Sequence, residues 1–132
     1  MILFKHEHLK DEFDQLDPRL KTILYYICGF ASNEFYKDIT ITGLLRSQAQ
    51  QDAIYALNLN YQKSPWLSVH QFMRGADVST RNLSEDEVLI LTEMLNFMFH
   101  YSPGKKTALY HDVGLGAHLH LQVPGKSVSI FY

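Results

Sequence analysis

The segment A-H-L-H-L-Q-V, residues 117–123, constrains the fold more than any other part of the sequence. Successive side chains of a β-strand point to opposite faces, so Leu119 and Leu121 share one face while His118 and His120 share the other. One apolar face indicates a sheet that is covered on one side only. The other face presents two imidazoles, which are either incidental groups on a solvated surface or part of a functional site.

Helical patterns come first along the chain, and strand patterns dominate its end. Apolar residues at helical spacing predict helices over residues 18–30 (with Asp17 as N-cap), 47–60 and 84–101, the last of them central and well buried. Alternating or β-branched runs predict strands over residues 38–45, 75–80, 106–113, 118–123 and 127–132. We therefore expect one α+β domain spanning residues 1–132, with a small antiparallel sheet covered by helices.

Composition and charge exclude several classes of function. The 132-residue chain is 46% hydrophobic, which is typical of a globular domain, and its net charge of −2 without a basic stripe argues against nucleic-acid binding. The single cysteine, Cys28, excludes an intramolecular disulfide and a zinc site built from cysteines. Neither a secretory signal nor a membrane-spanning run is present. We expect a monomer made in the cytoplasm, without membrane insertion, that needs a separate release mechanism if it acts elsewhere.

Asp77 lies in a predicted strand between two apolar residues. A carboxylate buried in such a place costs free energy unless it has a partner. The partner could be an arginine, for which Arg46 and Arg74 are candidates, or it could be a metal ion.

His70 precedes Asp77 by seven residues, a spacing that puts the two side chains on opposite faces of a straight strand. A turn between them, for which Gly75 supplies the flexibility, would bring them together. His70 and Asp77 could then supply two metal ligands, and the H-x-H strand a third. Two histidines and one carboxylate, with one position left open, form the ligand set of a catalytic zinc site.

These two segments together resemble a known family. The stretch S-V-H-Q-F-M-R-G-A-D-V resembles the S-x-H-(x)6-D motif of the D-alanyl-D-alanine carboxypeptidase and dipeptidase family of zinc peptidases. A-H-L-H-L-Q-V is similar to the H-x-H motif that this family shares with murein endopeptidases and with the zinc domain of hedgehog proteins. Upstream, D-I-T-I-T-G-L-L-R-S-Q-A-Q-Q-D-A-I-Y is similar to the family's strand, arginine-serine turn and helix. The resemblance implies a hedgehog/DD-peptidase-like fold, in a phage-endolysin-like or murein-endopeptidase-like member.

The resemblance also implies a cofactor, a reaction and a role for each residue. The cofactor would be Zn²⁺, and its ligands would be His70, Asp77 and His120. His118 would lie beside the metal as a catalytic group, Arg46 would bind substrate carboxylate or the developing oxyanion, and Ser68 would help to hold the substrate. The implied reaction is hydrolysis of peptide bonds in D-amino-acid-containing stem peptides of peptidoglycan, by a carboxypeptidase or an endopeptidase, with metal-activated water as the nucleophile.

One feature departs from the family's pattern. Many members carry a glutamate as general base shortly before the third ligand, whereas residues 114–117 here read G-L-G-A. The base would then be His118, or else His111 or Asp112 on the preceding strand. The missing glutamate leaves open a catalytically inactive zinc-binding module that binds cell wall or a protein partner. A domain without any metal is the third interpretation.

Overall fold

The computed structural model describes residues 1–111, 116–125 and 129–130. The described strands are β1 (Ile2–Phe4), β2 (Ile39–Gly43), β3 (Gly75–Val78), β4 (Ala108–His111) and β5 (His118–Gln122). The described helices are α1 (His8–Asp14), α2 (Pro18–Phe30), α3 (Gln48–Ile54), α4 (Leu59–Lys63) and α5 (Glu85–Met98), with a π-helical segment η1 (Ala31–Phe35) and a 3-10 helix η2 (Val69–Phe72). None of these helices has the length and apolar character needed to cross a membrane.

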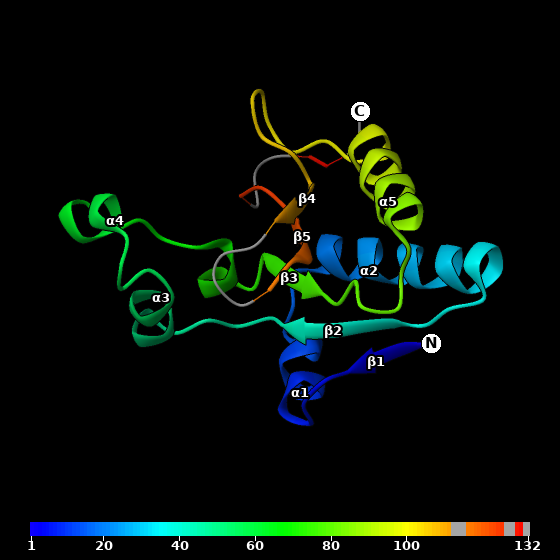
Figure 1. Ribbon diagram of the computed structural model, residues 1–132, viewed down its shortest axis with the longest axis horizontal. Helices are drawn as coiled ribbons and strands as arrows, with labels where there is room; N and C mark the ends of the chain where they lie inside the picture. The colour runs from blue at the N-terminus through cyan, green and yellow to red at the C-terminus, as the bar shows by residue number, and fades with distance from the viewer. Residues whose placement is uncertain (112–115, 126–128, 131–132) are drawn as a thin grey trace.

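The described strands form one mixed sheet in the order β1-β2-β3-β5-β4 (Figure 1). The pairs β2–β3, β3–β5 and β4–β5 are antiparallel, whereas β1 runs parallel to β2. The α+β class is therefore confirmed, and the prediction of a wholly antiparallel sheet is wrong at β1. A three-residue strand is too short to show an alternating pattern, and its parallel pairing becomes possible because α1 and α2 form the crossover to β2.

One face of the sheet is buried in the apolar core, together with α2 and α5. The strands contribute alternate residues to this core, as the period of a half-buried strand requires. The fully buried members on the strands and on α2 and α5 include Ile41, Ala76, Val78, Leu119, Leu121, Leu20, Ile23, Leu24, Ile27, Leu91 and Leu95. Leu119 and Leu121 thus occupy the core as predicted, so His118 and His120 are turned to the opposite face.

The helices begin where capping residues allow. The side chain of Asp17 accepts a hydrogen bond from the backbone N–H of Arg19, which confirms it as the N-cap of α2. The helix predicted over residues 47–60 is in fact two short helices, because Asn58 accepts from the backbone N–H of Tyr61 and starts α4 anew. Figure 1 shows α3 and α4 together at one end of the molecule, away from α2 and α5.

Helix α5 is less buried than its apolar sequence suggests. Ser84 and Glu87 form the capping box at its start, as the S-x-x-E pattern indicates. Leu91 and Leu95 enter the core, but Leu89 is 54% exposed, and Phe97 is 83% exposed. The prediction of a central helix buried over most of its circumference is therefore wrong, since only one face of α5 packs on the core.

The strand predicted over residues 127–132 lies mostly outside the described residues. Within that range, Ile130 is buried in the core, and its carbonyl accepts from the backbone N–H of His100 (2.6 Å).

The turn that links His70 to β3 differs from the prediction. Met73, and not Gly75, takes the left-handed conformation, with φ of 58°. Gly75 instead provides space, because a Cβ built there would lie 2.6 Å from Cγ2 of Val69 and 3.1 Å from the backbone nitrogen of His70. The absence of a side chain at residue 75 therefore lets η2 close against β3 and sets the position of His70.

Replacement of Gly75 by alanine is expected to lower the free energy of unfolding by about 1–3 kcal/mol, since the new methyl group overpacks the contact with η2. Gly29→Ala is the matched control, because a Cβ at residue 29 meets nothing within 4 Å and alanine is favoured in a helix by roughly 1 kcal/mol. Thermal unfolding should therefore show a lower Tm for Gly75→Ala and a higher Tm for Gly29→Ala. A Tm for Gly75→Ala at or above that of the wild type would contradict this account.

Candidate metal centre

Strand register gathers four metal-binding side chains on the sheet face opposite the core. Asp77 on β3 pairs directly with His120 on β5, and His111 on β4 pairs with His118 on β5. Directly opposed residues of an antiparallel pair share a face, with Cβ atoms about 4.5–5.5 Å apart. Three neighbouring strands therefore bring one carboxylate and three imidazoles together, from segments that are far apart in the sequence.

His70 reaches the same place from η2. It is 2% exposed, and its Nδ1–H donates to the carbonyl oxygen of Leu44 (2.7 Å). A carbonyl oxygen only accepts, so Nδ1 carries the proton and Nε2 of the neutral ring carries the lone pair. That Nε2 is fully buried, lies 3.3 Å from Oδ1 of Asp77, and makes no hydrogen bond within the described part of the chain.

His120 has the opposite tautomer, but it too directs a ring nitrogen with a lone pair at Asp77. The amide nitrogen of Gln122 donates to the carbonyl of Lys106 (2.7 Å), which turns the amide oxygen of Gln122 towards Nε2 of His120 (3.0 Å). Nε2–H of His120 donates to that oxygen, so the lone pair of the neutral ring is on Nδ1, 3.1 Å from Oδ1 of Asp77. His118 is oriented in a similar way, because its Nδ1–H donates to the carbonyl of Gly116 (3.0 Å) and its Nε2 lies 3.2 Å from Oδ1.

The arrangement around Asp77 needs positive charge between its members. In their neutral forms, three imidazoles direct ring nitrogens that carry lone pairs at a single carboxylate oxygen, which is repulsive unless a proton or a metal ion lies between them. Metal-binding histidines characteristically donate their other N–H to a carbonyl or an amide oxygen, as all three do here. The site therefore has the outer hydrogen bonds of a metal centre.

The distances also suit a zinc ion. Bonds of about 2.0–2.1 Å in a tetrahedral site place neighbouring ligand atoms roughly 3.3 Å apart. The nitrogens of His70 and His120 lie 3.3 and 3.1 Å from the Asp77 oxygen, and one ligand atom from each of the three residues lies within 4.8 Å of the others. His70, Asp77 and His120 thus form a cluster that could hold a metal ion, without a large rearrangement.

Charge at the centre depends on Asp77, which is 9% exposed. Burial on its own raises the pKa of this carboxyl, but the approach of the His118, His120 and His70 imidazoles outweighs burial and holds the pKa well below its usual range. Asp77 is therefore an anion at neutral pH. The other oxygen of Asp77, Oδ2, lies 3.9 Å from Nη2 of Arg46. Asp77 therefore has an arginine partner, as one of the two sequence-based alternatives predicted, in addition to the three imidazoles.

The second arginine considered as a partner, Arg74, is engaged elsewhere. Its Nη1 donates to the carbonyl of Val123 (3.5 Å), and its guanidinium lies over the ring of Phe72.

Arg46 and Ser68 form a network beside the centre. Nη1 of Arg46 donates to Oε1 of Gln51 (2.8 Å) and to Oγ of Ser68 (3.2 Å). The same Oγ accepts from the backbone N–H of His70 and caps η2. Binding of substrate by Ser68 stays a prediction. In the structure, its Oγ connects Arg46 to the backbone of His70 and so fixes the position of Arg46 relative to His70.

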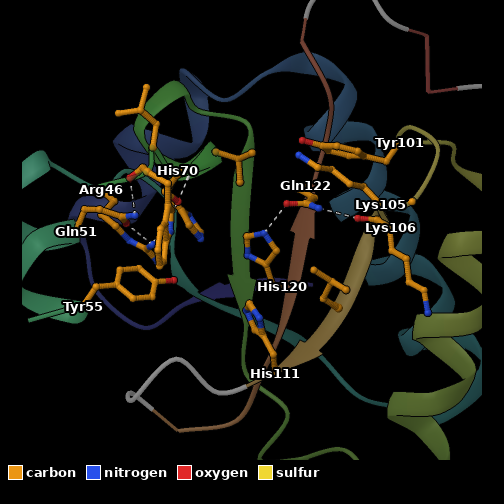
Figure 2. A pocket seen from close by; sticks show the side chains of 16 residues that line it. Arg46, Gln51, Tyr55, His70, Tyr101, Lys105, Lys106, His111, His120 and Gln122 are labelled. Carbon is orange, nitrogen blue, oxygen red and sulfur yellow. Dashed lines mark hydrogen bonds between the residues drawn. The ribbon is translucent and has the colours of Figure 1, made fainter. Parts of the chain in front are cut away.

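Two hollows meet at the cluster. The Trp66 hollow, of about 490 Å³, is lined by residues that include Tyr55, Trp66, Lys105, Lys106, His111 and His120. The Lys5 hollow, of about 850 Å³, is lined by residues that include Lys5, Arg81, Asp77 and His118. Both hollows include Arg46 and His70, and Figure 2 shows these two on one wall of the Trp66 hollow, with His111, His120 and Gln122 on the facing wall. The cluster is therefore accessible from two sides.

The two hollows are basic although the chain is slightly acidic. Lys105, Lys106 and Arg46 are the charged residues of the Trp66 hollow, and Lys5, Arg46 and Arg81 lie in the Lys5 hollow. Among their described lining residues, Asp77 is the one carboxylate. These surfaces favour a ligand that carries negative charge.

His111 remains a candidate for proton transfer, and Asp112 lies outside the described residues. Burial, followed by the imidazoles of His120 and His118, lowers the pKa of His111 from its ordinary value, so the ring is neutral at pH 7.

Gln122, which orients His120, is not among the predicted site residues. The signal was present, because Gln122 follows His118 and His120 at the two-residue period of the same strand face.

Comparison of the chain with protein-family models, with curated proteins and with solved structures found no match in any of the three. The site is therefore interpreted from its own chemistry.

A test of the network is the replacement of Ser68 by alanine, which removes the N-cap of η2 and one hydrogen bond of Arg46. We expect the free energy of unfolding to fall by about 1 kcal/mol, and zinc affinity to fall roughly 10-fold, as when an outer partner of a ligand is lost. Ser84→Ala, which removes the equivalent cap of α5 outside both hollows, should lower stability alike and leave zinc affinity unchanged. Urea unfolding and zinc titration measure both effects, and equal zinc affinities in the two variants would restrict Ser68 to a capping role.

Proposed function

We propose that this chain is a zinc-dependent peptidase that hydrolyses peptide bonds in the stem peptides of bacterial peptidoglycan. The observation that supports this most strongly is the convergence of His70 and His120 on Oδ1 of Asp77, with a fully buried Nε2 of His70 that lacks a hydrogen-bond partner in the described chain. The assignment to the hedgehog/DD-peptidase fold belongs to the same proposal, and rests on the S-x-H-(x)6-D and H-x-H motifs.

The proposed ligands are His70, Asp77 and His120. Zinc, when bound there, supplies Lewis acidity that makes a water molecule nucleophilic near neutral pH. Gln122 and the carbonyl of Leu44 hold the two imidazoles in the tautomers that present a lone pair. These three ligands would leave zinc open to a water molecule, which the two hollows would admit.

His118 is the proposed general base. The carbonyl of Gly116 fixes Nδ1–H of this ring, so Nε2 is directed to the centre and can accept a proton there. The same nitrogen can return that proton to the leaving amine.

Arg46 and the lysines of the Trp66 hollow are the proposed substrate-binding groups. Nη2 of Arg46 lies near Oδ2 of Asp77, where a guanidinium can stabilise negative charge on a substrate carbonyl oxygen or bind a carboxylate. Lys105 and Lys106 add positive charge in the same hollow. Stem peptides carry carboxylates, so their charge complements this surface.

The experiment that tests this function is the incubation of protein loaded with one zinc equivalent with purified sacculi, followed by mass spectrometry of the muropeptides. We expect new peptide ends that are absent from incubations with Asp77→Ala or with chelator-treated protein. The masses of the products also distinguish release of a single terminal residue from cleavage within the peptide.

A zinc-binding module without catalysis is the second candidate. It is favoured by the lack of a carboxylate, other than Asp77, among the described residues of both hollows. Such a protein would bind one zinc ion and co-sediment with sacculi, but would release no fragments. Intact muropeptides after incubation with protein that carries one zinc equivalent would therefore reject the peptidase proposal in favour of this one.

A further inference from the structure

Next to the proposed zinc ligands lies a second group of metal-binding side chains. Asp77, His111 and His118 each offer one ligand atom, and these atoms all lie within 4.8 Å of one another. The strand register accounts for this, because His111 and His118 are directly opposed on β4 and β5, with ring centroids 4.9 Å apart. The group shares Asp77 with the first cluster, and neither of its histidines is a proposed ligand of the first zinc ion.

The donors of this second group are suited to the same kind of cation. Two imidazoles and one carboxylate provide the nitrogen and oxygen ligands that zinc takes in proteins. The Nδ1–H of His118 donates to the carbonyl of Gly116, and its Nε2 lies 3.2 Å from Oδ1 of Asp77, so this ring has the orientation of a metal ligand. His111 makes no hydrogen bond or ion pair within the described part of the chain, and its ring contacts those of His118 and His120.

We propose that the chain binds two zinc ions, the second of them held by His111, His118 and a shared carboxylate of Asp77. The second ion binds more weakly than the first. His111 is less buried than His70, and no outer partner among the described residues orients it, so binding must order this ring. The shared carboxylate must also partly neutralise two cations instead of one.

The second ion has a consequence for catalysis, which rests on the proposed function. It occupies Nε2 of His118, the atom to which we assign proton transfer. Zinc in excess of one equivalent is therefore expected to inhibit hydrolysis, while zinc up to one equivalent activates it. Binding of the second ion does not itself depend on the function.

The test is calorimetric titration of zinc into the metal-free protein, with bound metal counted after equilibrium dialysis. Wild type should bind two ions of unequal affinity. His111→Ala should retain the first ion and weaken the second by more than about 100-fold, beyond what loss of an outer hydrogen-bond partner costs. His100→Ala, which alters a histidine that is in neither group, should bind both ions. Retention of the first ion by His111→Ala shows that this variant is folded.

Binding of a single ion by wild type up to millimolar zinc, or of two ions by His111→Ala, would overturn the proposal. Cobalt substitution gives an independent reading, because the visible spectrum should change again between one and two equivalents in wild type but not in His111→Ala. The muropeptide assay separates this proposal from the proposed function. Two bound ions, with no hydrolysis even at one zinc equivalent, reject only the peptidase, whereas hydrolysis by protein that binds no second ion up to millimolar zinc rejects only the second site.

Discussion

Alanine at His120 or at Asp77 is expected to abolish tight zinc binding. Each substitution removes one of three protein ligands, and the loss should exceed the roughly 100-fold that removal of an outer partner costs. Asp77→Ala should have the larger effect, because Oδ1 of Asp77 is the atom on which His70, His118 and His120 converge. Calorimetry with zinc, and metal analysis of the dialysed protein, measure the change.

The matched control for these ligand variants is His100→Ala, since His100 lies outside both metal-binding groups. Circular dichroism should show that all the variants retain helix and strand. One zinc ion per chain in His120→Ala, at wild-type affinity, would remove His120 from the ligand set, and the same result in Asp77→Ala would remove Asp77.

His118→Ala is expected to separate zinc binding from turnover. The first zinc ion should remain, because His70, Asp77 and His120 are intact. Turnover should fall by about 10²–10⁴-fold, the range for loss of a general acid–base group. The measurement is the rate of muropeptide release at one zinc equivalent, in parallel with metal analysis.

His111 is the rival base, and the same assay distinguishes the two. Wild-type turnover in His118→Ala would refute the role of His118. If His111→Ala alone then lost turnover, the base would be His111. With His118 as the base, His111→Ala should keep the turnover of the wild type far better than His118→Ala does.

The elements nearest to the site could be predicted from local sequence, because their patterns are local. The alternation in A-H-L-H-L-Q-V places Leu119 and Leu121 in the core, and His118 and His120 on the other face. Asp17 and Ser84 cap the helices that their side chains predict. In such cases the preference of a few consecutive residues agrees with the final packing.

The remaining features depend on contacts that no short pattern encodes. Strand β1 exists because of its pairing with β2, and α5 is exposed on one side because no other described element covers Phe97. The pairing of Asp77 with His120 is a result of strand register, which the local sequence does not determine. The group that orients His70 is the backbone carbonyl of Leu44, and any residue type at position 44 would provide such a carbonyl. The turn does require Gly75, but the reason is the space that it leaves to Val69 and not its conformational freedom.

The position of β5 has a consequence for the order of events during biosynthesis. This strand lies between β3 and β4, yet the ribosome makes it after both of them. Without residues 118–122, β3 would be an edge strand and Asp77 would lack His118 and His120. A nascent chain stalled before residue 118 should consequently fail to capture the proposed zinc ion, so that metal binding would follow, and not precede, the insertion of β5 into the sheet.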